Sequence, residues 1–399
     1  MSCSSITRSG ATSARLPLIP LLALALGGFV TILTEALPAG LLPQISSGLN
    51  ISEAMAGQLV TIYAIGSLLA AIPLTVMTQG MRRRRPLLIT AMAGFVVANT
   101  ITAFSDSYFL TMSARFVAGI AAGLLWALLP GYASRMVSES LQGRAIAIAM
   151  VGTPLALSLG VPAGTFLGNL VGWRMCFGIM SIMALLLVLW IYIRVPDFPG
   201  QKNSQRLPLH RVLGVAGVRP VLLAVLTFVL AHNILYTYIA PFINASGIGG
   251  QTDIALLLFG ITSLLGIWVT GMFIDAHLRG LTLGSTVLFA LSAAALGVAS
   301  HIPAVTYASI AAWGLAFGGA ATFFQTAMAK TAGDVADVAQ SMVVTVWNTA
   351  IAGGGLIGGL LLNHMGVAAF PPALLILLAA TFIIVFIARK HGFPPISRN

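Results

Sequence analysis

The sequence predicts an all-α membrane protein, with twelve transmembrane helices that form two six-helix bundles related by a pseudo-two-fold repeat. Three observations favour this fold class. The 399 residues are 58% hydrophobic and only 7% charged, whereas an ordinary soluble domain carries roughly 25% charged residues. Twelve apolar runs of about 18 to 28 residues are each long enough to cross a bilayer as a helix. The basic residues gather in the short gaps between these runs.

The predicted spans follow one another along the whole chain. Their centres lie near Phe29, Gly66, Phe95, Leu124, Leu157, Leu185, Val229, Gly266, Leu291, Leu315, Ile351 and Ile383. The first run is longer than the apolar core of a signal peptide, which is about 7 to 15 residues. We therefore expect it to remain as the first helix. Pro and Gly interrupt many of the runs, and transmembrane helices tolerate this.

The basic residues predict the orientation of the chain. If the N-terminus lies in the cytoplasm, all of the 20 basic residues except Arg115 and Arg174 fall in inner gaps or tails. The positive-inside rule therefore predicts that both termini are cytoplasmic. Proteins that bind nucleic acids instead spread Lys and Arg over a solvated face. The excess of positive charge thus indicates membrane topology, and no nucleic-acid partner is expected.

The longest gap between the spans divides the chain. Residues 196–219 contain three prolines and four basic residues with a polar run, so they predict a cytoplasmic linker. The linker separates an N-terminal bundle at 16–195 from a C-terminal bundle at 220–389. Residues 1–15 and 390–399 are expected to be cytoplasmic tails.

The two halves also share a residue pattern. At one constant offset, Gly119 and Arg135 match Gly314 and Lys330. The same offset matches glycines of the fifth span with glycines of the eleventh. Parallel six-helix repeats joined by a basic loop are typical of secondary transporters, which hold their substrate near the middle of the membrane between the repeats.

Glu35 is the only acidic residue well inside a predicted span. Counted back from Pro43 at about 1.5 Å per residue, it lies roughly 12 Å below the outer end of the first span. A carboxylate that faces lipid is costly, so Glu35 is expected to face a cavity. The functional interpretation is a group that exchanges a proton or binds a cation. The alternative is a structural hydrogen bond to a neighbouring helix.

Arg115 is the only basic residue inside a predicted span, and it lies at about the same depth as Glu35. The two side chains are expected to pair if the first and fourth spans meet. In one interpretation Arg115 is a switch that keeps Glu35 ionised until substrate or a proton intervenes. In the other, the pair only holds two helices together.

Four further residues are weaker candidates for the wall of a substrate cavity. They are Trp126 in the fourth span, His232 and Tyr236 one turn apart in the seventh, and Asn348 in the eleventh. His232 could also titrate in the physiological range. For each of these side chains, packing between helices remains the alternative interpretation.

The sequence shows no signature of a nucleotide-driven or enzymatic protein. It contains no G-x-x-x-x-G-K-[ST] run, the loop that cradles nucleotide phosphates. No set of nucleophile, base and acid stands out, and neither does a cluster of metal ligands. The two cysteines, Cys3 and Cys176, lie far apart. No cofactor or metal is therefore expected, and the energy for transport would come from an ion gradient.

Four short segments lie within these predicted spans: Thr34–Pro43, Arg115–Gly119, Gly160–Thr165 and Tyr236–Pro241. Together they resemble the major facilitator superfamily over essentially the whole chain. More narrowly, they are similar to its twelve-helix drug/proton antiporters, in the branch of arabinose- or sugar-efflux-like and purine-efflux-like permeases. The resemblance implies that Arg115 takes part in proton coupling.

The resemblance also assigns conformational motifs, with one departure. It implies that Gly160, Pro162 and Gly164 form the antiporter motif of the fifth span. The family carries a Gly and an Asp before a basic run in the loop between the second and third spans. Here Arg84 and Arg85 retain the basic end, but Gly80 stands at the acidic position. The latch in the first half is therefore expected to be weak or to use another partner.

The corresponding loop of the second half keeps both positions, as Gly271 and Asp275. Taken together, the sequence predicts a monomeric secondary transporter, surrounded by lipid in the bacterial cytoplasmic membrane. Its expected activity is proton-coupled export of a small organic molecule by alternating access, with a sugar, a nucleoside or a drug as substrate. One alternative is a proton symporter that imports a sugar or nucleoside. Another is a membrane sensor on the same fold that transports nothing.

Overall fold

The computed structural model of the chain is helical throughout the part that it describes. That part is residues 16–393, apart from 79–82, 139–140 and 199–208. It contains α-helices with short 3-10 and π-helical turns and no strand. Twelve of its segments are long and apolar enough to cross a membrane. The predicted fold class is therefore confirmed, whereas the predicted tail at 1–15 lies outside the described residues.

The first half forms six spans. Its elements are α1 (Leu18–Gly40), α2 (Leu42–Leu49), α3 (Glu53–Thr78), α4 (Arg85–Phe104), α5 (Tyr108–Arg135), α6 (Gln142–Met150), α7 (Gly152–Leu155), the π-helical turn η2 (Ala156–Gly160), α8 (Val161–Val171) and α9 (Trp173–Arg194). The four elements from α6 to α8 together make the fifth span. The short helix α2 is an addition at the outer end of the first span.

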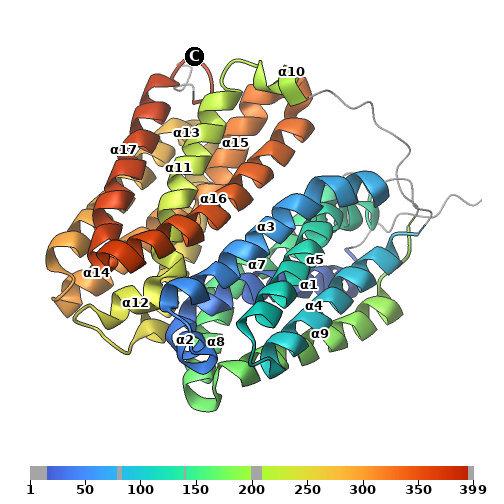
Figure 1. Cartoon of the computed structure of the whole chain (residues 1–399). Helices are drawn as coiled ribbons and strands as arrows, with labels where there is room; N and C mark the ends of the chain where they lie inside the picture. Colours follow the sequence, from blue (N-terminus) through green and yellow to red (C-terminus); the bar gives the residue numbers. More distant parts are fainter. Residues whose placement is uncertain (1–15, 79–82, 139–140, 199–208, 394–399) are drawn as a thin grey trace, which may run out of the picture.

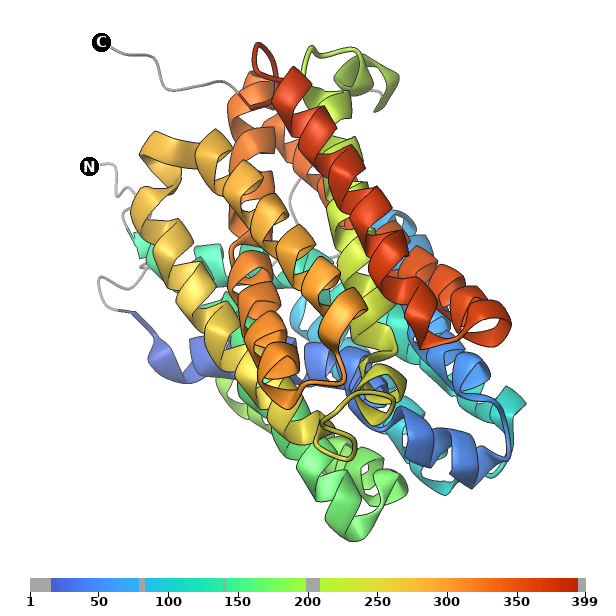
Figure 2. The same ribbon diagram turned by 90° about the vertical axis from the view of Figure 1, so that its left-hand side faces the viewer.

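The second half begins after the short helix α10, which lies in the predicted linker. Its elements are α10 (Leu209–Leu213), α11 (Val218–Thr237), α12 (Ile239–Asn244), α13 (Thr252–Ala299), α14 (Pro303–Gly318), α15 (Ala320–Ala332), η3 (Gly333–Val335), α16 (Ala336–Met365), η4 (Val367–Ala369) and α17 (Phe370–Ile387). Helix α13 contains two spans, because its backbone departs from helical geometry at His277. Figure 2 shows its two arms lying side by side.

The two halves meet at one end of the molecule and separate toward the other (Figure 1). They meet near α2, α8 and α12, which lie at the outer side by the predicted topology. They diverge toward the inner side, where α10 and the end of α17 lie. Helix α3 packs on α16, and α13 packs on α8 and η2. These contacts form most of the interface between the halves, and α1 adds smaller contacts with α11 and α12.

Glycines allow the helices of this interface to approach closely. A side chain at Gly57 would overlap the ring and the hydroxyl of Tyr238. At Gly355, an added Cβ would overlap Oγ1 of Thr61 on the opposite half. Small residues are the usual means of bringing backbones together in membranes. The outer contact between the halves therefore depends on these glycines.

Hydrogen bonds across the halves also gather at the outer side. The Gln58 amide donates to the Gly355 carbonyl over 3.0 Å and to the hydroxyl of Tyr238 over 3.2 Å. Thr61 donates to the Ala352 carbonyl over 3.4 Å. One turn of α3 is thus bonded to one turn of α16. We refer to this contact, with its glycines, as the outer closure.

Further inward, the same two helices no longer cover each other. Val60 and Ala64 of α3 pack on Ile351 of α16. Beyond them, Val344, which lies two turns before Ile351 on the same face of α16, is 42% exposed. Figure 1 shows the two halves diverging toward this end. By the predicted topology, the halves meet at the outer side and separate toward the inner side, which is an inward-facing arrangement.

Candidate functional site

Glu35 lies in the outer half of α1, close to the second half of the chain. Its side chain is partly buried, and within the described residues its carboxylate accepts no hydrogen bond. Helix α1 contacts α11 and α12 here. Helix α11 carries Tyr236, another of the predicted site residues. The residue predicted to be the coupling group is therefore an unpaired carboxylate at the boundary between the halves.

Arg115 of α5 is only 1% exposed and binds main-chain oxygens. Its Nε donates to the Leu59 carbonyl over 3.2 Å, and its Nη2 donates to the Glu35 carbonyl over 3.2 Å. Its Nη1 donates to the Thr34 carbonyl. Within the described residues, no ion pair joins its guanidinium to the Glu35 carboxylate within 4.0 Å. The predicted proximity is present, but the expected direct ion pair is not formed.

Pro38 explains why the arginine turns to the backbone. In an α-helix, the carbonyl of Thr34 would accept a hydrogen bond from the N–H four residues later. That residue is Pro38, which has no N–H. A carbonyl without a donor is costly inside a membrane. Arg115 supplies the missing donor, and this fixes its guanidinium on the backbone of α1.

Two further side chains hold the same turn of α1. The ring of Tyr63 lies beneath the guanidinium of Arg115, 4.8 Å from ring centre to Cζ, and its hydroxyl donates to the Thr31 carbonyl over 3.0 Å. The amide of Asn99 donates to Oγ1 of Thr34 over 3.2 Å. Helices α3, α4 and α5 therefore each contribute a side chain that binds the turn before Glu35. The sequence reasoning missed Tyr63 and Asn99.

The glycines of the predicted antiporter motif face α1. A Cβ at Gly160 would lie 2.8 Å from the ring of Phe29, and a Cβ at Gly164 would lie 2.6 Å from Cδ1 of Leu37. Pro162 follows the π-helical turn η2 and cannot donate to the carbonyl four residues earlier, which belongs to Ser158. The motif therefore sets the packing of the fifth span against the helix that carries Glu35.

The same π-helical turn touches the second half. A Cβ at Gly260 of α13 would overlap the backbone of Ser158. Backbone therefore meets backbone at this point, with no side chain between. Since η2 also contacts α1, a movement of α13 relative to the first half would act directly on the element beside α1.

The weaker cavity candidates do not form one cluster. His232 and Tyr236 are buried in an aromatic core of the second half. Trp126 packs over Gly28 of α1, on the inner side of Glu35. The amide of Asn348 donates to the Val344 carbonyl of its own helix over 3.0 Å. Among the described residues, no hydrogen bond or ring contact joins Trp126 or Asn348 to any other of these four.

The basic loop of the first half does have an acidic partner, Asp197. Its Oδ1 accepts hydrogen bonds from the backbone N–H groups of Arg84 and Arg85, each over 3.0 Å, at the start of α4. Its Oδ2 lies 3.4 Å from Nε of Arg83. A carboxylate is favourable at a helix N-terminus. Asp197 follows α9, so this contact ties the loop to its own half.

The corresponding loop of the second half is described only in part. Gly271 is exposed, and a Cβ added there would meet nothing within 4 Å. Asp275 belongs to α13, but its side chain lies outside the described part. The predicted role of these two positions stays a prediction.

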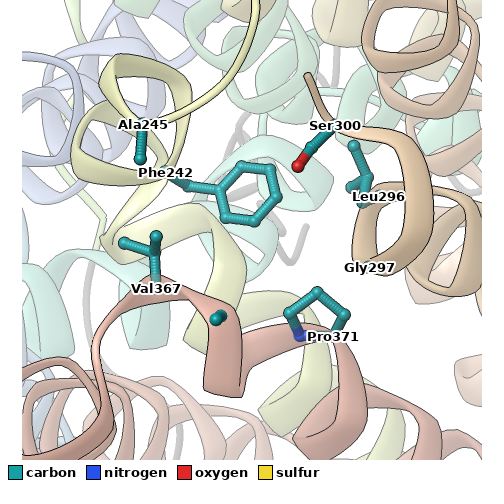
Figure 3. Close-up of a pocket in the computed structure, with 8 residues that line it drawn as sticks. Phe242, Ala245, Leu296, Gly297, Ser300, Val367 and Pro371 are labelled. Carbon is teal, nitrogen blue, oxygen red and sulfur yellow. The ribbon is translucent and has the colours of Figure 1, made fainter. Parts of the chain in front are cut away.

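A cavity of about 190 Å³ lies at the outer end of the second half. In Figure 3, Phe242 of α12 faces Leu296 of α13 and Ser300, the residue that follows α13, with Pro371 of α17 nearby. Ser300 is the one residue with a polar side chain among the eight that line the cavity. None of the predicted site residues belongs to it, so it is separate from the surroundings of Glu35.

These features define a class of protein. Twelve spans in two similar halves, a closure at the outer ends and one unpaired carboxylate at the boundary are the parts of a secondary transporter. The family model of the Major Facilitator Superfamily matches residues 24–358. The chain belongs to the Major Facilitator Superfamily.

Similar proteins are known in enterobacteria. The purine ribonucleoside efflux pump NepI of Escherichia coli (strain K12) is 29% identical over 338 residues, which cover 84% of this chain and 85% of the pump. The NepI of Escherichia coli O6:H1 (strain CFT073) is 30% identical over the same shares. The chain is thus a multi-pass protein of the bacterial inner membrane, and it is a secondary transporter that exports a small molecule.

Solved structures share the fold. A D-xylose–proton symporter matches with a TM-score of 0.76 at 18% identity, covering 94% of this chain and 97% of the symporter. The xylose transporter XylE from E. coli, in an inward open conformation, matches with a TM-score of 0.74 at 16% identity. That match covers 95% of this chain and 96% of XylE.

Proposed function

We propose that this chain exports purine ribonucleosides in exchange for protons, and that Glu35 is the group that carries the proton. The names of the relatives support the substrate class. The geometry around α1 supports the role of Glu35. The single observation that carries the proposal is that Arg115 is engaged by main-chain carbonyls, which leaves the Glu35 carboxylate free to accept a proton.

The position of Glu35 links its charge to the movement of the halves. An ionised carboxylate enclosed between packed helices is costly, whereas the protonated acid is neutral and can donate a hydrogen bond. Because the inner ends of the halves are separated in the inward-facing state, we expect Glu35 to release its proton toward the cytoplasm. Loss of the proton leaves Glu35 negatively charged. This charge opposes closure of the inner side until bound substrate shields it. Protonation from the outside would then complete the exchange.

The experiment that tests this role of Glu35 compares Glu35→Gln with Glu53→Gln in vesicles that carry a pH gradient. The glutamine amide introduced by Glu35→Gln keeps the size of the side chain and cannot exchange a proton, so gradient-driven movement of labelled adenosine is expected to be lost. Glu53 lies at the outer start of α3, so the control variant is expected to transport as the wild type does. Both variants should be present in the membrane at equal amounts.

Gradient-driven adenosine export by Glu35→Gln at the wild-type rate would contradict the proposed role of Glu35. Adenosine movement in the same direction as the protons would contradict exchange and would favour the symporter alternative. A protonophore added to the wild type supplies the reference for transport without a gradient.

A further inference from the structure

Within the described residues, four polar atoms of the second half are buried without a hydrogen-bond partner, and three of them lie in one place, whereas the fourth is Oγ1 of Thr237. The three are Nδ1 of His232, the hydroxyl of Tyr236 and Nε1 of Trp313. The three side chains are 6%, 5% and 0% exposed. Their ring centres lie 5.1 to 6.2 Å apart. Buried polar groups normally have partners, so three neighbouring exceptions need an explanation.

The surrounding rings form a stack that reaches the boundary between the halves. The ring of Phe317 lies on that of His232, with centres 3.4 Å apart and planes 7° apart. Phe259 lies 4.4 Å from Trp313. We call His232, Tyr236, Phe259, Trp313 and Phe317 the aromatic cluster. Of these five, Phe317 is the partly exposed member, so it covers the others from outside.

The uncovered side of Phe317 faces the interface. Its ring centre lies 6.1 Å from that of Trp347 on α16. Trp347 in turn packs on the cross-half contact of Val60 and Ala64 with Ile351. On another side of the cluster, Tyr236 lies on α11, which contacts α1, the helix that carries Glu35. The cluster therefore adjoins both the moving interface and the proposed proton site.

We propose that the aromatic cluster is the subsite for the heteroaromatic base of the substrate, an inference that rests on the proposed export of nucleosides. The base takes the place of the Phe317 ring against His232, and Phe317 turns toward Trp347. The indole N–H of Trp313 donates to an acceptor on the base. The hydroxyl of Tyr236 and Nδ1 of His232 bind further polar atoms at its edge.

The chemistry of the cluster selects for this kind of ligand. Trp Nε1 is only a donor, whereas the Tyr hydroxyl can donate or accept, and so can a His ring nitrogen according to its tautomer. A planar ring with both acceptors and donors at its edge can form hydrogen bonds with all three of these polar atoms. Stacking on aromatic side chains is the common way in which proteins hold an unpaired base. A free sugar offers hydroxyls but no planar face for the stack.

The proposal is tested by equilibrium binding of labelled adenosine to the purified protein, with unlabelled adenine and ribose as competitors. Tyr236→Phe and Trp313→Phe remove single hydrogen-bonding atoms, and each is expected to weaken adenosine binding about tenfold or more. Phe317→Ala removes the ring that the base must displace, so it is expected to tighten adenine binding. Adenine is expected to compete in the wild type, and ribose is not.

Matched variants control for general effects of the substitutions. Tyr307→Phe and Trp268→Phe change the same residue types on the outside of the second half, where Trp268 is 61% exposed. Both are expected to bind adenosine as the wild type does. Thermal unfolding of each variant identifies any that fails to fold. Tyr236→Phe loses one unpaired hydroxyl, so it keeps the proposal testable if Trp313→Phe unfolds.

The outcomes separate this inference from the function on which it rests. If the wild type exchanges adenosine for protons but Tyr236→Phe and Trp313→Phe bind it normally, the aromatic cluster is packing alone and only the subsite is overturned. Weaker adenine binding by Phe317→Ala would also overturn the displacement of that ring. If the wild type neither binds nor exports adenosine, both the function and the subsite are wrong.

Discussion

Arg115 holds its buried charge by donating to main-chain carbonyls of α1 and α3. A guanidinium suits this role because it presents several N–H donors in a fixed plane. The carbonyl that most needs a donor is that of Thr34, because Pro38 leaves it without its helical partner. At the scale of the residue, Arg115 therefore replaces the backbone hydrogen bond that the first helix lacks because of its proline.

This account predicts that a substitution of the proline rescues a substitution of the arginine. Arg115→Lys keeps the charge but loses the fork of donors, so it is expected to cost about 1–3 kcal/mol of stability. In the Arg115→Lys background, Pro38→Ala restores the N–H for the Thr34 carbonyl and is expected to recover part of the loss. The thermal unfolding midpoints of the single and double variants measure both effects. If the double variant were no more stable than Arg115→Lys, Arg115 would not be acting as the replacement donor for the Thr34 carbonyl.

The sequence predicted the depth of Glu35 and Arg115 but not how they meet. Depth follows from counting residues at a fixed rise per residue. The partner of Arg115 depends on the rotation of α5 about its axis, and spacing along one helix does not report that rotation. The signal was nevertheless present, because Pro38 stands four residues after Thr34 and indicates a carbonyl without a donor.

At the scale of the element, the fifth span is shaped to lie against α1. Gly152 approaches the backbone of α1 most closely, because an added Cβ would overlap the Ala25 carbonyl oxygen. At Gly164 the nearest atom is the end of the Leu37 side chain, which can move aside. The two glycines therefore differ in what a methyl group would displace.

This difference predicts a graded response to added methyl groups. Gly152→Ala must separate two backbones, so it is expected to destabilise the protein by about 1–3 kcal/mol. Gly164→Ala is expected to cost less, since a side chain can rotate. A Cβ at Gly178 of α9 meets nothing within 4 Å, so Gly178→Ala should be neutral or stabilising by up to about 1 kcal/mol. Unfolding midpoints in one detergent rank the three, and equal midpoints would contradict the packing model.

The spans themselves were predictable from hydropathy and length, whereas their interruptions were not. The twelve predicted centres all fall within candidate spans of the structure. The π-helical turn η2 and the separate helix α2 leave no periodic signal, because they depend on contacts with other elements. Asp197, the acidic partner of the basic loop, was missed for the same reason. It lies far along the chain from Arg84 and Arg85, which it binds.

At the scale of the whole molecule, the structure shows one of the two states that alternating access needs. The outer closure is bonded through Gln58, Thr61 and Tyr238, and the inner ends are separated. Two states of one chain differ by only a few kcal/mol. The sequence therefore predicts the fold of both and cannot indicate which is observed. The outer closure must open for the proposed exchange to proceed.

A disulfide across the outer closure is predicted to stop transport. A Cβ at Gly355 would lie 3.4 Å from Cβ of Thr61, which is close to the roughly 3.8 Å that separates Cβ atoms in disulfides. The oxidised Thr61→Cys/Gly355→Cys variant is expected to lose adenosine export, and a reductant should restore it. Thr61→Cys alone, under the same oxidant, is the control. Full export by the verified cross-linked protein would show that the outer closure need not open.

The central claim is that Glu35 exchanges a proton for each movement of substrate, and proton flux tests it most directly. Proteoliposomes loaded with adenosine and a pH-sensitive dye, with no imposed pH gradient, are diluted into medium without adenosine. In the wild type, efflux of adenosine is predicted to draw protons inward and acidify the lumen. In Glu35→Gln the pH of the lumen is predicted to stay constant, whereas labelled adenosine inside is still expected to exchange when unlabelled adenosine is added to the medium. Equal acidification by Glu35→Gln and the wild type would contradict the claim.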